Sequence, residues 1–289
     1  QTGARVMTGA LTVEGEPTTL TDYEHLEEHT TVTGLSRQDG RMIVKLAESP
    51  FYAEGGGQIS DGGVIACEDG DCLVRVTDVV RAGDDQAIVV EQVDGELKAG
   101  ERVVARVDRA ARNATQANHT ATHLLHAALR NRLGPHVHQA GSYVGPDKLR
   151  FDFSHTQRLS EEERRDVEDQ VNAWILRNDP VRPLTTTLDE AQRLGAMALF
   201  GEKYGDVVRM VEVGDGSYSR ELCGGTHVRS TAEIGLFKII SEGSSASNVR
   251  RIEAVTGPEA VGLLRRHDQL LHESADVLRT QPERLPEAV

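Results

Sequence analysis

The sequence predicts an α+β protein in three parts: a small β-barrel over residues 1–108, a mixed α+β domain over residues 109–257, and a helix over residues 258–289. Three observations lead to this prediction. Short apolar runs alternate with Asp-Gly turns in the first part, helical and strand-like periods alternate in the second, and leucines recur every seven residues in the third. A length of 289 residues also exceeds that of a typical single domain.

The first part is expected to be all β. Apolar runs at 42–44, 72–74 and 87–90 are separated by Asp-Gly pairs, and this regular spacing is typical of a small barrel or sandwich. The segment Ser49-Pro-Phe-Tyr-Ala-Glu-Gly-Gly-Gly-Gln58 interrupts the pattern. Three consecutive glycines are unsuited to a strand interior, so they predict either a loop whose backbone another group approaches closely or a plain barrel turn.

The second part mixes both periods. Apolar residues at helical spacing predict a helix from His119 to Leu133, and Ser160 with Glu163 forms a capping-box pattern before a second helix that ends near Asn178. A short helix is expected from Asp189 to Leu194. Strand-like runs lie at 149–153, 207–213, 236–240 and 249–255.

After Gly257-Pro258 the sequence predicts one helix to about Arg279. Two stripes of residues spaced seven apart follow it, Leu264, Leu271 and Leu278 beside Leu263, Leu270 and Val277. They indicate packing against another helix and possible oligomerisation in a longer protein. The stripes cover only about three heptads before two prolines, so we expect this chain to be a monomer whose helix folds back on the preceding domain.

The formal net charge of -14 argues against a general nucleic-acid binder, because phosphate binding depends on clustered Lys and Arg. Local basic clusters do occur between Arg130 and Arg150, at 250–251 and at 265–266. They suit one specific RNA, or they are ordinary solvated faces. The sequence has neither a membrane-length apolar run nor a signal-peptide pattern, which predicts a cytoplasmic protein with no membrane partner. Gln1 suggests a fragment of a longer chain.

Two of the three cysteines, Cys67 and Cys72, flank a predicted hairpin turn. They could face each other across the hairpin, but in a cytoplasmic protein we expect free thiols. A metal role for this pair is not expected, because no nearby His or Cys completes a site.

Cys223 belongs to a metal-ligand pattern. His119 and His123 are four residues apart on a predicted helix, which places both imidazoles on one face. Cys223-Gly-Gly-Thr-His227 favours a tight loop that turns both side chains toward one point. Three imidazoles and one thiolate make a full tetrahedral set for one Zn²⁺ ion per chain.

The same residues allow other interpretations of the metal site. His126 lies on the same helix face and is either an alternative ligand or a residue that packs beside the ligands. A zinc-protease motif needs Glu directly after the first His, and Thr120 stands there instead. A purely structural zinc is the stronger rival, because four protein ligands close the coordination shell.

The residues resemble the editing domain of alanyl-tRNA synthetases. The segments that carry the resemblance are His119-Thr-Ala-Thr-His123-Leu-Leu-His126, Gln139-Ala-Gly-Ser142, Arg150-Phe-Asp-Phe153, Gly201-Glu-Lys-Tyr204, Glu221-Leu-Cys-Gly-Gly-Thr-His227 and Arg250-Arg-Ile-Glu-Ala254. Pro50-Phe-Tyr-Ala-Glu54 and Gly56-Gly-Gln58 resemble the barrel that precedes this domain in the family. Two departures, Ser49 where Thr is expected and Gly55 where Ser is common, affect fine specificity.

The resemblance implies hydrolysis of the ester that links serine or glycine to tRNA for alanine. It assigns the zinc ligands to His119, His123, Cys223 and His227, and it places Gln139 near the scissile ester. An amide does not titrate near neutral pH, so Gln139 is expected to position substrate or water rather than to remove a proton.

Further residues are candidates for binding the substrate. The loop that contains Gly56, Gly57 and Gln58 is expected to line the pocket. Ser49, or a neighbouring hydroxyl such as that of Thr120 or Thr122, could hydrogen-bond the serine hydroxyl, so that alanine would leave a buried polar group unpaired. Arg150 is a candidate for the terminal phosphates of the tRNA, with an ordinary surface charge as the alternative.

Three functions remain in competition at this point. The first is a cis-editing module of the synthetase, and the second is a free-standing alanyl-tRNA editing protein. The third is a non-catalytic zinc module that binds tRNA or another partner. The third leaves Gln139 and the glycine loop without a task.

Overall fold

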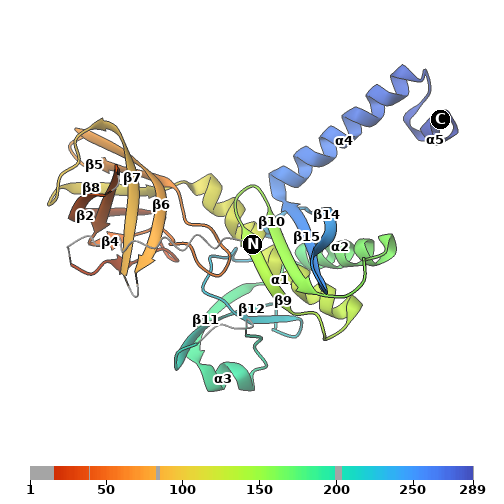
Figure 1. Cartoon of the computed structure of the whole chain (residues 1–289), viewed down its shortest axis with the longest axis horizontal. Coiled ribbons are helices and arrows are strands. Elements are labelled where there is room, and N and C mark those ends of the chain that lie inside the picture. The colour runs from red at the N-terminus through yellow and green to blue at the C-terminus, as the bar shows by residue number, and fades with distance from the viewer. Residues whose placement is uncertain (1–15, 39, 83–84, 199–203, 289) are drawn as a thin grey trace. The chain divides into compact units, whose positions relative to one another are not determined.

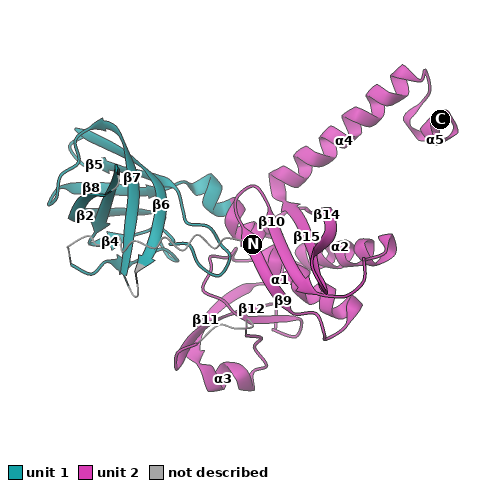
Figure 2. Ribbon diagram, in the orientation of Figure 1, with its two compact units in different colours: residues 1–113 teal, residues 114–289 magenta. Residues whose placement is uncertain are grey.

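The computed structural model describes residues 16–38, 40–82, 85–198 and 204–288 (Figure 1). The chain divides into two compact units, residues 1–113 and residues 114–289 (Figure 2). The sequence places a boundary at 108/109, where helix α1 begins, whereas the two units divide inside this helix. The C-terminal helix belongs to the second unit.

Within the described residues of the first unit, six antiparallel strands close a barrel in the order β2-β3-β7-β6-β5-β8. Their bounds are Glu27–Gln38 (β2), Arg41–Leu46 (β3), Gly63–Cys67 (β5), Cys72–Ala82 (β6), Asp85–Gly95 (β7) and Arg102–Val107 (β8). Val44, Ile65, Val74 and Val103 are fully buried in the barrel core. A short parallel pair, β1 (Thr19–Leu20) with β4 (Glu48–Ser49), lies beside it. The expected all-β first part is confirmed.

The Asp-Gly positions mark strand ends as expected. Gly95 closes β7 at a φ of +59°, and a Cβ built there would lie 1.7 Å from the carbonyl oxygen of Asp71, so only glycine fits. Gly40 and Gly70 also have positive φ. Asp39, the other half of one predicted turn, lies outside the described residues.

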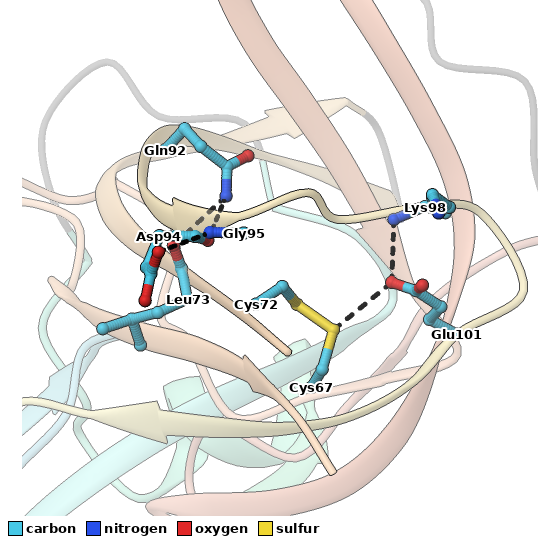
Figure 3. Close-up of a disulfide and its surroundings, with 8 residues drawn as sticks. All are labelled: Cys67, Cys72, Leu73, Gln92, Asp94, Gly95, Lys98 and Glu101. Atoms are coloured by element: carbon cyan, nitrogen blue, oxygen red, sulfur yellow. Dashed lines mark hydrogen bonds between the residues drawn. A yellow bond between two sulfur atoms is a disulfide. The ribbon is translucent and has the colours of Figure 1, made fainter. Parts of the chain in front are cut away.

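The expectation of free thiols at Cys67 and Cys72 is wrong, because the structure joins them in a disulfide (Figure 3). Cys67 ends β5, Cys72 begins β6, and their Cα atoms are 5.1 Å apart. The hairpin register therefore brings the two side chains together, a local constraint that reasoning from the cellular compartment ignores. Cys67 Sγ also lies 3.3 Å from Oε2 of Glu101, a carboxylate that the sequence spacing did not reveal.

The described residues of the second unit form two sheets. One has the order β14-β15-β10-β9 and the other β11-β12-β13. Their strands are Gln139–Val144 (β9), Leu149–Ser154 (β10), Val181–Thr187 (β11), Val207–Val213 (β12), Ser219–Leu222 (β13), Phe237–Ala246 (β14) and Val249–Thr256 (β15). The predicted strands are confirmed, and β9, β11 and β13 are additional. The sequence hides β9 because only its last residue is fully buried, so no two-residue period is visible.

Helices α1 (Arg109–Leu133) and α2 (Glu161–Leu176) share one core with the four-stranded sheet. This core includes Leu124 and Leu125 of α1, Trp174 of α2, and Phe151 of β10. A short helix, α3 (Leu188–Arg193), and the 3₁₀ turn η1 (Thr231–Ile234) complete the domain. The expected α+β architecture is confirmed.

α1 begins ten residues before the predicted start. In this first part of α1 the buried face contains Arg112, which is 2% exposed. Because this buried residue is charged, the apolar pattern that predicts the rest of the helix does not extend to its start. The guanidinium of Arg112 donates to the carboxylate of Asp61 and to the carbonyl oxygens of Asp22 and Pro50. A buried charge is tolerated because it is paired and fully hydrogen-bonded.

The C-terminal helix α4 (Gly257–Val277) does not fold back on the sheets. Its first turns contact β14 and β15, whereas Leu264, Leu271 and Leu278 are 42–44% exposed. The turn η2 (Pro282–Arg284) and the short helix α5 (Leu285–Ala288) follow, and η2 packs against α4. The predicted helix is confirmed, and its folding back is not observed.

Candidate functional site

Helix α1 places three histidines on one buried face. His119, His123 and His126 are each at most 6% exposed. The rings of His119 and His123 are stacked with centroids 5.3 Å apart, as expected for residues one helical turn apart.

The second half of the site is the loop that follows β13. Arg209 holds this loop, because its Nη1 donates to the carbonyl oxygens of Cys223 and Gly225 at 2.8 and 2.9 Å. The N–H of Gly225 points at Cys223 Sγ at 3.4 Å. The expected tight Cys-Gly-Gly-Thr-His loop is confirmed.

The four residues expected to bind zinc converge. One ligand atom from each of His119, His123, Cys223 and His227 lies within 4.8 Å of every other. Cys223 Sγ is 3.4 Å from Nε2 of His119 and 3.3 Å from Nε2 of His227. Nε2 of His123 is buried and has no hydrogen-bond partner within the described part of the chain. An orphaned buried nitrogen beside a sulfur and two imidazoles fits a tetrahedral metal site.

The pKa values of Cys223 and His227 are shifted in the directions that favour metal binding. Burial alone would raise the pKa of the Cys223 thiol, but the neighbouring histidines outweigh it and lower this pKa well below the ordinary 9.0. Burial, with help from His119, lowers the pKa of His227 to about 3. A thiolate and a neutral imidazole are the forms that coordinate metals.

His123 differs from these two. Burial favours its neutral form, but Glu221 and Cys223 outweigh burial and raise its pKa to about 10. A cation bound at Nε2 would have to displace that proton.

Glu221, at the end of β13, joins two of the histidines. Its Oε2 lies 2.8 Å from Nδ1 of His123 and its Oε1 lies 2.9 Å from Nδ1 of His126. Burial would raise the pKa of this carboxyl, but the two imidazoles outweigh it and lower the pKa below its ordinary value of 4.5. Glu221 therefore orients His123 through its second ring nitrogen, a common device at metal-binding histidines. Our sequence analysis did not single it out, although it stands two residues before Cys223.

Thr120 has a similar contact on the other side. Its Oγ1 lies 3.1 Å from Nδ1 of His227 and accepts the N–H of Val228 at 3.3 Å. Thr120 is fully buried, so its hydroxyl contacts a candidate metal ligand. Its expected contact with a substrate hydroxyl stays a prediction.

A cavity of about 290 Å³ is connected to this cluster through Glu221, which lines it and contacts His123. It is lined by His126, Arg130, His138, Gln139, Met197, Ala198 and Glu221. Gln139, the first residue of β9, donates from Nε2 to Ser142 Oγ at 3.4 Å. The cavity thus joins the expected catalytic glutamine to the carboxylate that orients His123. Residues 201–203 of the Gly-Glu-Lys-Tyr motif lie outside the described residues.

Arg150 lies on β10 between Phe151 and Leu149, both fully buried in the core, so its side chain is on the opposite face of the sheet. Its Nε is 3.9 Å from Asp152 and makes no hydrogen bond. Lys148 is paired with Glu253 at 2.7 Å.

The remaining candidates belong to the first unit. Ser49 and Gln58 are fully buried, and Ser49 Oγ accepts the N–H of Phe51 at 3.4 Å. Gly56 and Gly57 have φ of +59° and +85° in a turn closed by hydrogen bonds between Gly55 and Gln58. The structure therefore has the predicted loop at Gly55–Gln58. Its contact with the substrate stays a prediction.

Comparison with known proteins decides the family. Residues 208–253 match the family described as threonyl and alanyl tRNA synthetase second additional domain, and residues 12–111 match tRNA synthetases class II (A). The chain is 49% identical to the alanine--tRNA ligase of Thermotoga maritima over 283 residues, and 48% identical to that of Halorhodospira halophila. In each case 94% of this chain is covered.

The chain corresponds to a region of the alanyl-tRNA synthetase family. It spans 32% of the length of these two ligases. The alanine--tRNA ligase of Rubrobacter xylanophilus is 51% identical over 252 residues. Glu221, Cys223 and His227 lie inside the second-additional-domain match, and the glycine loop lies inside the class II match.

In the described part of the chain, no helix has the length and apolarity needed to cross a membrane. The cytoplasmic location stays a prediction.

Proposed function

We propose that this region of an alanyl-tRNA synthetase is an editing module that hydrolyses the ester of tRNA for alanine charged with serine or glycine. The observation that carries the proposal is a cavity that is lined by Glu221, the carboxylate bonded to His123 of the histidine-cysteine cluster. It brings Gln139 and Glu221 to one small space. A volume of about 290 Å³ is near the lower end for small-molecule sites and suits a small polar aminoacyl group.

The donor set supports one Zn²⁺ per chain, held by His119, His123, Cys223 and His227. When bound, zinc supplies a fixed positive charge that stabilises nearby negative charge and orients polar groups. Thr120 and Glu221 hold the second nitrogens of two of these histidines. Gln139 positions the ester or the attacking water through its amide, because an amide neither gains nor loses a proton near neutral pH.

The tRNA partner is proposed to contact Arg150 through a phosphate near its acceptor end. Arg150 is a better candidate than Lys148, because the ion pair of Arg150 with Asp152 is longer, at 3.9 Å, than that of Lys148 with Glu253, at 2.7 Å. Ser49, Gly56, Gly57 and Gln58, which belong to the first unit, remain proposed contacts of the charged tRNA.

A non-catalytic zinc module is the second candidate, and one observation favours it. Four protein side chains close the coordination shell, as they do in structural zinc sites. Under this alternative Gln139 and the cavity have no task.

Incubation of the chain with seryl-, glycyl- and alanyl-tRNA for alanine separates the two. We expect release of serine and glycine well above the rate without protein, and alanine to remain attached. If none of the three esters is lost faster than in buffer, while zinc is bound, the non-catalytic module is correct.

A further inference from the structure

His126 has a buried nitrogen that the proposed function does not use. The residue is 5% exposed, and its Nδ1 is bonded to Glu221 at 2.9 Å. Nε2 is buried and has no hydrogen-bond partner among the residues that the structure describes. Since His126 lines the cavity, Nε2 is the polar atom that its ring can offer there.

The contact between Nδ1 of His126 and Glu221 determines whether Nε2 of the same ring donates or accepts a hydrogen bond. A carboxylate only accepts hydrogen bonds, so Nδ1 of His126 donates and the neutral ring keeps a lone pair on Nε2. The other oxygen of the same carboxylate accepts from Nδ1 of His123. Glu221 therefore engages Nδ1 of both rings and leaves Nε2 as the second ring nitrogen of each, on His123 within the histidine-cysteine cluster and on His126 within a residue that lines the cavity.

The other polar groups that line the cavity are less suited to accept a proton there. Both oxygens of Glu221 are engaged by histidines. Arg130 is a cation whose Nη1 donates to the carbonyl oxygens of Pro135 and Val137. His138 is exposed to solvent. His126 is the buried imidazole next to Gln139.

We propose that His126 is the general base of the editing reaction, accepting a hydrogen bond and then a proton from the attacking water at Nε2. This inference rests on the proposed function and adds a catalytic residue to it. In this reaction the amide of Gln139 positions the ester or the attacking water, and the imidazole of His126 accepts the proton.

The step balances without an additional reactant. The water oxygen forms a bond to the ester carbonyl carbon, and one water proton moves to Nε2 of His126. The bond between the carbonyl carbon and the ribose oxygen then breaks, and that oxygen receives the proton from Nε2. The products are the free amino acid and tRNA with its terminal hydroxyl restored.

Two substitutions separate this role from a purely structural one. His126→Asn places an amide near the position of Nδ1, so it can still donate to Glu221, but it removes the acceptor at Nε2. His126→Gln reaches toward the position of Nε2 and loses the short contact with Glu221. His136→Asn, at an exposed histidine beyond the end of α1, is the matched control.

The experiment measures kcat and KM on seryl-tRNA for alanine with the zinc-loaded chain. Zinc content and binding of a non-hydrolysable serine amide of 3′-amino-3′-deoxyadenosine are measured alongside. For His126→Asn we expect a fall in kcat of about 100-fold or more, the usual contribution of a general base, with KM, zinc content and analogue affinity unchanged. His136→Asn should match the unsubstituted chain.

A kcat of His126→Asn within about threefold of the unsubstituted chain overturns the inference and leaves the editing function standing. Loss of zinc in both His126 variants assigns this residue to holding Glu221 and also overturns it. An unsubstituted chain that does not hydrolyse seryl-tRNA overturns the proposed function together with the inference, whether or not the analogue binds.

Discussion

Glu221 organises the site at the scale of single residues. One buried carboxylate contacts His123 on one oxygen and His126 on the other. It therefore links the metal cluster to the cavity that contains Gln139. Under the proposed function, this arrangement separates a metal-binding role, at the cluster, from a chemical role, at the cavity.

Gln139→Ala tests the chemical role. We expect the variant to keep its zinc and its thermal unfolding but to lose about 100-fold in deacylation rate, comparable to the loss of one preorganised hydrogen-bond donor. Single-turnover deacylation of seryl-tRNA measures this. An unchanged rate would show that Gln139 only packs at the start of β9.

Cys223→Ala tests the binding role. Removal of the thiolate should weaken zinc binding by more than about 100-fold and abolish deacylation. Competition with a chromophoric chelator measures the affinity. Cys67→Ser is the matched control, because that cysteine lies in the barrel and should leave zinc binding intact. Equal zinc affinity in Cys223→Ala and the unsubstituted chain would exclude Cys223 as a ligand.

The ligand residues could be selected from the sequence because their geometry is local. A four-residue spacing on a helix and a two-glycine loop each fix a pair of side chains. The contacts of Glu221 and Thr120 could not be predicted. Each depends on β13 and its loop packing against α1, about 100 residues earlier in the chain, and no periodic pattern encodes that distance.

At the scale of elements, the start of helix α2 could be predicted from a local sequence pattern. Ser160 and Glu163 form the predicted capping box, with the Glu163 N–H donating to Ser160 Oγ at 3.1 Å and the Ser160 N–H donating to Glu163 at 2.8 Å. The start of α1 was missed for the opposite reason. Its buried face there contains Arg112, whose partners in distant loops give no local pattern. The Cys67–Cys72 disulfide differs from the predicted free thiols because the register of the β5–β6 hairpin brings the two side chains together, which an expectation based on the cellular compartment does not consider.

Ser160→Ala should destabilise the second unit by about 1 kcal/mol, the usual cost of losing an N-cap. Trp174 is the single tryptophan of the chain and lies on α2, stacked on Tyr218, so its fluorescence during urea unfolding reports this helix directly. Ser160→Asp, which preserves a capping oxygen, is the control. Equal midpoints for Ser160→Ala and the unsubstituted chain would contradict the prediction.

The same cap predicts a pH dependence. The hydrogen bond from the Ser160 N–H lowers the pKa of Glu163 below its ordinary 4.5. A carboxyl whose folded-state pKa is lowered stabilises the fold above its unfolded pKa, and this contribution is lost as the pH falls through the folded value. The stability difference between the unsubstituted chain and Glu163→Gln should therefore shrink as the pH falls below about 4.5. A difference that is constant with pH would exclude this linkage.

At the scale of the whole molecule, α4 presents apolar residues to solvent. Leu264, Leu270 and Leu271 are 42–59% exposed. Three heptads are near the lower limit for a stable coiled coil, so we expect a monomer at micromolar concentration. Sedimentation equilibrium tests this. A dimer that dissociates on Leu271→Asp, but not on Arg265→Asp, would contradict the monomer and identify α4 as the interface.

The central claim is that a zinc-dependent hydrolytic site discriminates serine from alanine on the same tRNA. The most direct measurement titrates metal-free protein with zinc and follows deacylation of seryl- and alanyl-tRNA in parallel. We predict that seryl-tRNA hydrolysis rises with zinc and saturates at one ion per chain, while alanyl-tRNA is spared. Full activity without zinc, or equal loss of both esters, would contradict the account.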